Sequence, residues 1–252
     1  MITLSNPGHP VAISLLYGLF LFICTIYNVS GQENPEVVYI RASTEKIAQI
    51  VGDHDNETDQ PTQNQTLSRY NLWGTDLGIP FQHKNKIYML FGDVPGSDRD
   101  PIAYTEDDDP EDGLDLTFIT TPGGDFRPIT IPGISQGAFE VPVEGVSVND
   151  VMYVYFSTGH FQQLVLAKST DDGLTFELVG EISQESFINV SIEQVETDVW
   201  PGLPTVEGTG IIIFGSGTYR QSNVKLAFQP VDQIEQKEAI RYFTGLNETK
   251  IP

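Results

Sequence analysis

The feature that most constrains the fold of this chain is an internal repeat. In each copy, a strand-like run ends at Phe, and a second run that carries Ala follows roughly a dozen residues later. The runs ending at Phe are 86–91, 151–156 and 211–214, and the alanines are Ala103, Ala167 and Ala227. A run containing Gly or Pro precedes each copy, at 76–80, 144–148 and 201–206. Repeats of about 60 residues with up to four strands each predict β-propeller blades, whose first strands lie nearest the central channel.

A second marker of the same architecture lies in the middle copy of the repeat. Residues 169–176 read Ser-Thr-Asp-Asp-Gly-Leu-Thr-Phe, which matches the Asp-box motif. We expect Asp171 to accept backbone hydrogen bonds and Gly173 to supply the turn that closes the outer hairpin of a blade. A degenerate copy occupies residues 112–118 of the first repeat. The Asp-box indicates architecture, so its aspartate is assigned a structural role.

The remaining sequence also favours an all-β fold class. Beyond residue 70, short runs of Val, Ile, Tyr and Phe alternate with Gly, Pro, Asn and Asp, and only 233–241 suggests a helical turn. Residues 52–68 are polar and turn-rich, which predicts a long surface loop. With the segment 36–69, the repeats amount to about three and a half to four visible blades in a domain spanning 32–252. Either the propeller is incomplete in this chain or further blades are too divergent to see.

Residues 1–31 have the character of an export segment. The apolar run 11–27 has about the length of a signal-peptide core or of a short membrane anchor. Both alternatives predict an extracellular or cell-surface protein, with membrane contact only through this segment if it is not cleaved. The one cysteine, Cys24, lies inside the run, so the mature protein is expected to fold without a disulfide.

The charge of the chain restricts its partners. The formal net charge is −22, from 35 acidic and 13 basic residues. A polyanion of this strength is repelled by nucleic acid phosphates and anionic membranes, which argues against nucleic acid as a partner and favours neutral glycans or cations. The acidic run 107–115 could bind calcium through its oxygens, but it lacks a defined ligand spacing and is first interpreted as a solvated loop. We therefore assign no cofactor and no metal site.

Asn-x-Ser/Thr triplets mark candidate glycosylation sites for an exported chain. They occur at Asn28, Asn56, Asn64, Asn189 and Asn247.

Asp76 and Asp93 are the best candidates for chemistry. If Lys84 and Asn85 form a two-residue turn, the two aspartates directly face each other on neighbouring strands, with Cβ atoms on the order of 5 Å apart. Like charges in this position destabilise a sheet, and their repulsion raises one pKa. One acid beside one base is the arrangement that glycoside hydrolysis uses. The alternative is that each aspartate merely ends a strand.

Trp200 and two histidines are further candidates for a functional role. Trp200 is expected on the first strand of its repeat, at the position equivalent to Asp76, either as a sugar-stacking platform or as a core residue. His83 beside a turn and His160 in a loop are interpreted as exposed polar residues. A sialidase, which the Asp-box would suggest, needs an arginine triad that the six arginines do not supply in a recognisable block. The histidines are scattered and predict no metal cluster.

Four blocks, at 74–80, 88–93, 141–147 and 214–227, resemble successive blocks of one family. It is a large family of bacterial and archaeal secreted propellers, long catalogued as a domain of unknown function. Some of its members are endo-D-arabinanases that cut the arabinan of mycobacterial cell walls. The resemblance covers about residues 36 to 230 and implies a five-bladed propeller, of which this chain is C-terminally short.

The same resemblance implies a site. The catalytic pair of the family falls on Asp76 and Asp93, and the Gly-Ser-Gly-x-Tyr-Arg block directs Tyr219 and Arg220 toward the pocket. Glu144, in the third block, is a further substrate-binding candidate.

Taken together, these features predict an exported, glycoside-hydrolase-like propeller. It would hydrolyse or recognise a furanose-rich, arabinan-like polysaccharide or glycoconjugate through paired aspartates, with Trp200, Tyr219 and Arg220 orienting the sugar. The alternative is a non-catalytic propeller at the cell surface that binds glycan or protein.

Overall fold

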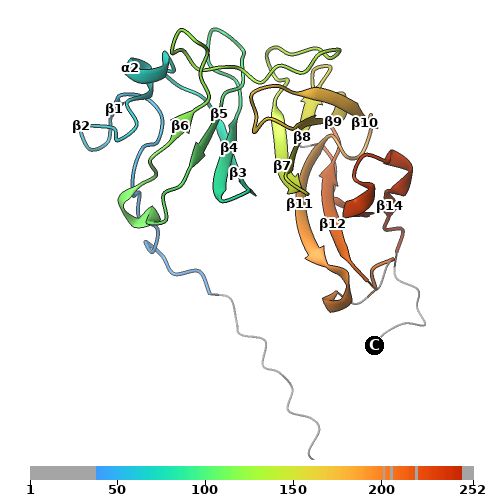
Figure 1. The fold of residues 1–252 in the computed structure, drawn as a ribbon. Helices are drawn as coiled ribbons and strands as arrows, with labels where there is room; N and C mark the ends of the chain where they lie inside the picture. Colours follow the sequence, from blue (N-terminus) through green and yellow to red (C-terminus); the bar gives the residue numbers. More distant parts are fainter. Residues whose placement is uncertain (1–37, 201, 205–206, 219–220, 246–252) are drawn as a thin grey trace, which may run out of the picture. The chain divides into compact units, whose positions relative to one another are not determined.

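The computed structural model describes residues 38–245, except for residues 201, 205–206 and 219–220 (Figure 1). The export segment predicted at 1–31 therefore lies outside the described residues. Residues 38–45 are exposed and contain a turn in which the Ser43 N–H donates to the Ile40 carbonyl at 3.3 Å. A compact unit begins at Lys46 and contains every strand described below. No helix in the described part of the chain is long and apolar enough to cross a membrane.

The described residues form three four-stranded antiparallel sheets, and in each sheet the strands follow one another in chain order (Figure 1). The first sheet comprises β3 (Leu77–His83), β4 (Lys86–Phe91), β5 (Ile102–Thr105) and β6 (Thr117–Phe118). The second comprises β7 (Pro142–Val148), β8 (Val151–Thr158), β9 (Gln163–Ser169) and β10 (Glu177–Ser183). The third comprises β11 (Asn189–Glu196), β12 (Thr209–Ser216), β13 (Lys225–Pro230) and β14 (Arg241–Tyr242). The predicted all-β class is confirmed at this level.

The polar stretch 52–68 is not the long surface loop that its composition predicts. It forms the two-stranded hairpin β1 (His54–Asp55) and β2 (Gln60–Pro61) and enters the short helix α2 (Thr66–Tyr70). The reason is that its polar side chains bond to buried backbone groups. Thr66 Oγ1 accepts the Gly52 N–H at 2.7 Å and donates to the Leu72 carbonyl at 2.7 Å. The described part of the chain also contains four short 3₁₀ helices: η1 (Pro110–Asp112), η2 (Thr197–Val199), η3 (Val231–Gln233) and η4 (Lys237–Ala239).

The repeat in the sequence corresponds to the second and third strands of each sheet. The repeated alanines Ala103, Ala167 and Ala227 pair with residues of β4, β8 and β12, respectively. All three are buried, and each belongs to a different hydrophobic cluster. A small side chain at this position allows the preceding layer of the protein to pack closely against the sheet.

The hydrophobic core lies between the faces of consecutive sheets. Leu90 and Ile102 of the first sheet pack in one cluster with Val154, Phe156 and Val165 of the second. A separate cluster joins the second and third sheets through buried residues of β8, β9 and β12, among them Tyr155, Leu166 and Ile211. The first strands of consecutive sheets are also neighbours in space: β3 contacts β7, and β7 contacts β11. Full burial of each large apolar side chain contributes about 1.5–3 kcal/mol.

The Asp-box forms the turn that its sequence predicts. It connects β9 to β10, and Asp171 Oδ1 accepts the Thr175 N–H at 2.8 Å while Gly173 adopts a φ of 89°. The degenerate copy likewise lies between β5 and β6, where Gly113 has a φ of 115°. Both motifs therefore close the outer hairpin of a sheet, and the aspartate is structural.

His83 is buried rather than exposed, which corrects the expectation from sequence. Its side chain, in a residue only 1% exposed, lies at the end of β3 between the first two sheets. Nδ1 lies 2.7 Å from Ser147 Oγ on β7, and Nε2 lies 3.1 Å from Oδ1 of Asp172 in the Asp-box. The β3–β4 turn packs against the second sheet, so a histidine beside it becomes an internal link.

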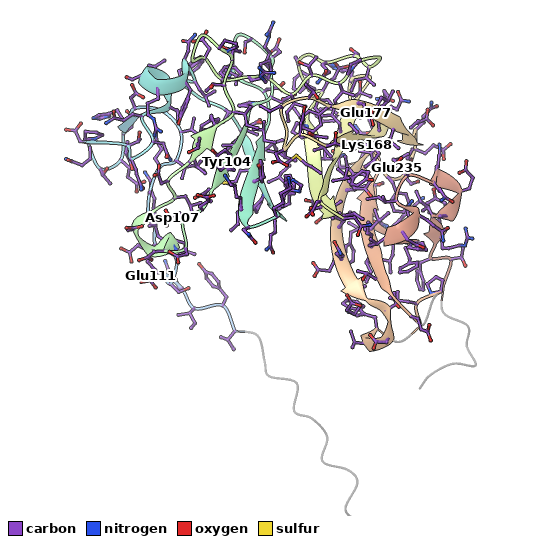
Figure 2. All side chains as sticks on the ribbon, viewed as in Figure 1. Tyr104, Asp107, Glu111, Lys168, Glu177 and Glu235 are labelled. Carbon is purple, nitrogen blue, oxygen red and sulfur yellow. The ribbon has the colours of Figure 1, made fainter. Side chains whose placement is uncertain are left out.

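A second polar link joins the second sheet to the connection between β13 and β14 of the third sheet. Lys168 Nζ on β9 lies 2.9 Å from Glu235 Oε1 and 3.3 Å from Glu177 Oε1, and the three side chains meet in Figure 2. The Tyr153 hydroxyl donates to the same Glu235 oxygen at 2.8 Å. Because the ion pairs are partly exposed, we expect each to contribute at most about 1 kcal/mol.

Replacement of His83 by Ala should destabilise the protein by about 2–3 kcal/mol, because it opens a cavity and removes a partner of Ser147 and Asp172. Urea unfolding followed by tryptophan fluorescence measures the change. Lys84→Ala is the matched control, since Lys84 pairs with the same Asp172 carboxylate from the surface and should cost less than about 1 kcal/mol. Equal losses for the two variants would contradict the assigned role of His83.

Candidate functional site

The predicted turn at Lys84 and Asn85 is confirmed, but the two aspartates are not directly opposed. His83 pairs with Lys86 as expected, and the register shifts by one residue between Leu77 and Ile79. The bulge falls at Gly78, whose φ of 112° few other residues adopt. As a result, Asp76 faces Gly92, whose N–H donates to the Asp76 carbonyl at 3.0 Å. Asp93 follows one residue later, so the two aspartates are near neighbours across the strand pair.

Gly92 makes room for the Asp76 side chain. A Cβ atom at Gly92 would collide with Asp76 Oδ1 and with the Leu77 side chain. The Thr75 hydroxyl donates to the Gly92 carbonyl on the same strand pair. The Asp76 carboxylate therefore lies against the bare backbone of Gly92, while Asp76 itself is exposed to solvent.

Asp93 is half-buried and held in a fixed orientation. Its Oδ2 accepts the Phe139 N–H at 3.0 Å, whereas Oδ1 is buried without a hydrogen-bond partner. Burial raises the pKa of Asp93 above its usual range, the Phe139 N–H opposes the rise, and the nearby charge of Asp76 adds to it. A carboxyl group in this state retains a proton more readily than an exposed one, as a general acid must.

Two further carboxyl groups, which sequence reasoning missed, lie in the same region. Asp100, just before β5, is 2% exposed, and its Oδ1 has no hydrogen-bond partner. Burial raises the pKa of Asp100 to about 9, with contributions from Asp93, Asp76 and Glu140. Glu140, just before β7, is also buried. It accepts hydrogen bonds from Ser135 Oγ at 2.9 Å and from the His160 N–H at 3.1 Å. Sequence reasoning missed both residues because turn-forming residues surround them, and an acidic side chain in such a segment predicts only a solvent-exposed loop.

Exposed aromatic side chains border these carboxyl groups. Phe139 is 52% exposed and directly precedes Glu140, and its ring meets His160 edge-on at a centroid distance of 5.2 Å. Trp73, also exposed, lines a hollow of about 370 Å³ together with Asp76. The sequence signal for Trp73 was its position just before the Gly-Thr-Asp block. The expectation that His160 is exposed is confirmed.

The predicted position of Trp200 is wrong. The first strand of the third sheet is β11, and Trp200 follows η2 in the connection from β11 to β12. The segment 189–196 forms that strand because it pairs with β12 along its whole length. Trp200 thus lies beyond the end of a first strand, whereas Asp76 lies before the start of one. The structure does not bring the two together.

Glu144 also lies apart from the aspartates. It lines a cavity of about 770 Å³ where β3, β7 and β11 end, and none of the four clustered carboxyl groups lines that cavity. Its side chain accepts the Ile192 N–H of β11 at 3.3 Å, and burial raises its pKa. Glu144 therefore joins the second sheet to the third. Tyr219 and Arg220 lie outside the described residues, and their roles stay predictions.

The candidate glycosylation sites differ in accessibility. Asn64 is buried, with its Nδ2 donating to the Ile50 and Leu114 carbonyls and its Oδ1 accepting the Leu116 N–H. This side chain binds three backbone groups and is closed to a glycan, which corrects the expectation. Asn189 is half-buried and donates to the Gly217 carbonyl at 3.0 Å, while Asn56 is exposed. Asn28 and Asn247 lie outside the described residues.

The acidic run 107–115 bonds to its own backbone. Asp107 accepts the N–H groups of Asp109 and Asp115 at 3.1 and 3.0 Å, and Asp109 accepts that of Glu111 at 3.2 Å. These bonds lower the pKa of Asp107. Figure 2 shows Asp107 and Glu111 at this loop. Among the described residues, no group of three or more His, Cys, Asp or Glu side chains is arranged to hold a metal ion.

Comparison with models of protein families gives a match. The model of a family described as a domain of unknown function, DUF4185, matches residues 61–250. The matched region includes the three sheets and all four clustered carboxyl groups. Among curated proteins, none matches the sequence.

Asp100→Asn should make the protein less sensitive to alkaline pH. In the folded chain Asp100 keeps its proton up to about pH 9, whereas in the unfolded chain it loses the proton near pH 4. The unfolded state therefore binds fewer protons in this window, and stability falls as pH rises, by at most about 1.4 kcal/mol per unit. Asparagine is neutral in both states and removes this loss.

Thermal unfolding at pH 4, 6 and 8 checks this prediction. The melting temperature of Asp100→Asn should exceed that of the wild type by an amount that grows with pH. Asp108→Asn, in the exposed acidic run, is the control and should show no such growth. A constant difference between Asp100→Asn and wild type across the three pH values would contradict the assigned burial effect.

Proposed function

We propose that this chain, which belongs to the family with the domain of unknown function DUF4185, is an exported, glycoside-hydrolase-like β-propeller that cleaves a polysaccharide. The observation that carries the proposal is the different environment of two neighbouring aspartates, Asp93 and Asp76. One carboxyl group is half-buried, with a free buried oxygen and a raised pKa, and the other is exposed beside it. Such a difference in environment between two adjacent carboxyl groups assigns an acid and a base.

The propeller architecture rests on three observations. Each sheet is a four-stranded meander, the first strands β3, β7 and β11 contact one another in series, and two outer hairpins carry Asp-box turns. In a propeller, blades of this kind converge with their first strands around a central channel. The predicted five-bladed form would need further blades beyond the three sheets described.

In the proposed reaction, the protonated Asp93 donates its proton to the glycosidic oxygen of the leaving sugar. Asp76 acts on the anomeric carbon, either by activating a water molecule or as the nucleophile. Asp100 is neutral at pH 7 because of its raised pKa. It therefore adds bulk and polarity beside the pair without a further negative charge. The configuration of the released sugar would distinguish the two roles of Asp76.

A furanose-rich, arabinan-like glycan is the proposed substrate, on the strength of the family resemblance. The net charge of −22 favours a neutral polymer over a nucleic acid or another polyanion. The apolar segment near the N-terminus supports an extracellular or cell-surface location.

The second candidate function is non-catalytic binding of glycan or protein. The observation that favours it is the cavity of about 770 Å³ at the ends of β3, β7 and β11, which is lined by polar side chains including Glu144, Gln194 and Asn149. A ligand there would lie away from the carboxyl pair.

Wild-type protein should release reducing sugars from an arabinan, and Asp93→Asn and Asp76→Asn should each lower the rate by about 100-fold or more, since general acid–base catalysis contributes this much. Both variants should still bind the polymer in affinity electrophoresis. An absence of hydrolysis across a panel of arabinans and other neutral glycans, with binding unchanged in Asp93→Asn, would favour the second candidate.

Gly92→Ala tests the position of the Asp76 carboxylate without altering either acid. The added methyl displaces Asp76 Oδ1, and a displacement of about 1 Å can lower a rate about 100-fold. Gly180→Ala on β10 is the matched control, because a Cβ there meets no atom within 4 Å. Rates and melting temperatures of both variants are compared. Full activity in Gly92→Ala would contradict the role given to Asp76.

A further inference from the structure

Three aromatic residues beside the carboxyl groups have strained backbones. Phe139, His160 and Phe161, which we call the aromatic platform, have φ angles of 68°, 60° and 59°. This left-handed region costs an L-residue roughly 1–2 kcal/mol, and bulky side chains rarely adopt it. Residues held in this way tend to occur at functional sites, where the surrounding structure imposes the conformation.

Carboxyl groups of the site hold the backbones of Phe139 and His160. Asp93 Oδ2 accepts the Phe139 N–H at 3.0 Å, and Glu140 Oε1 accepts the His160 N–H at 3.1 Å. Glu140 is itself held by the Ser135 hydroxyl at 2.9 Å. Ser135 in turn accepts a hydrogen bond from Thr158 Oγ1 through its carbonyl, at 2.6 Å. The loops before β7 and after β8 are thus tied to each other and to Asp93.

The Phe139 ring of the platform stays partly open to solvent. Phe139 meets the ring of His160 edge-on, at an interplanar angle of 84°, and lies 6.0 Å from the ring of Phe161. Although it has these neighbours, the Phe139 side chain stays about half exposed. Core packing would bury the ring, and a solvated loop would not need a strained aromatic residue. An open aromatic face suits the C–H face of a sugar ring.

We infer that the aromatic platform binds one sugar ring of a neutral polysaccharide next to the glycosidic bond that Asp93 protonates, and that Asp93 positions the platform through the Phe139 N–H. The inference rests on the proposed function and deepens it by naming a subsite and a substrate class. One hydrogen bond, from the Phe139 N–H to Asp93 Oδ2, sets the distance between the Phe139 ring and the acid. Asp76 and Glu140 disfavour uronic acid or sulfated sugars by charge repulsion.

The test compares Phe139→Leu with two further variants. Leucine keeps the apolar volume and loses the planar face, so affinity for a soluble arabinan should fall about tenfold, as expected for loss of an aromatic contact. Phe139→Tyr should restore the affinity. Phe214→Leu is the matched control, because Phe214 is a similarly exposed phenylalanine on β12. Affinity electrophoresis on gels containing arabinan, other neutral glycans or polygalacturonate measures binding, and KM is measured wherever hydrolysis occurs.

The outcomes separate the inference from the proposed hydrolase activity. Weaker binding in Phe139→Leu, with rescue in Phe139→Tyr, supports the platform even if the wild type hydrolyses nothing. An unchanged affinity and KM in Phe139→Leu overturns the platform even if the wild type cleaves arabinan. The inference also fails if the wild type binds no neutral glycan, or if it binds polygalacturonate as tightly as arabinan.

Discussion

Apolar side chains buried between consecutive sheets hold this protein together. The first and second sheets share one cluster, the second and third share another, and residues around Tyr70 and Leu72 cover the other face of the first. The only cysteine lies near the N-terminus, so no disulfide reinforces this packing within the sheets. Each sheet therefore depends on its neighbours for the burial of its faces, and polar links such as His83 fix the register between them.

The sheets were predictable from sequence because their signals are local. The turn at Lys84 and Asn85 and the Asp-box each act over a few residues, and both are found where they were expected. The runs that end at Phe are strands as expected, whereas the first strand of the third sheet is 189–196 instead of the expected 201–206. The bulge at Gly78 was also present in the sequence, as a glycine within a strand, but its one-residue shift changes which residue faces Asp76. Counting residues from the turn therefore placed the two aspartates near each other correctly, but it did not predict that Asp76 faces Gly92.

The remaining parts of the site depend on contacts distant in sequence. Asp100 and Glu140 are buried in the folded chain, and a single sequence carries no sign of that burial. The same holds for Asn64, whose partner Leu114 lies 50 residues away. Trp200 was misplaced because the repeat was aligned on glycine and proline, which mark turns as readily as strands.

The carboxyl cluster draws Asp76, Asp93 and Asp100 from the first sheet, and Glu140 from the start of the second. The site therefore lies at the junction of the two sheets, here called the seam. The hydrogen bond from the Phe139 N–H to Asp93 spans this seam. If the two sheets slid past each other by a fraction of a strand spacing, each would keep its own hydrogen-bond ladder while the seam lost its geometry. The rate of the proposed reaction would therefore respond to a change in sheet stacking more sensitively than any measure of secondary structure.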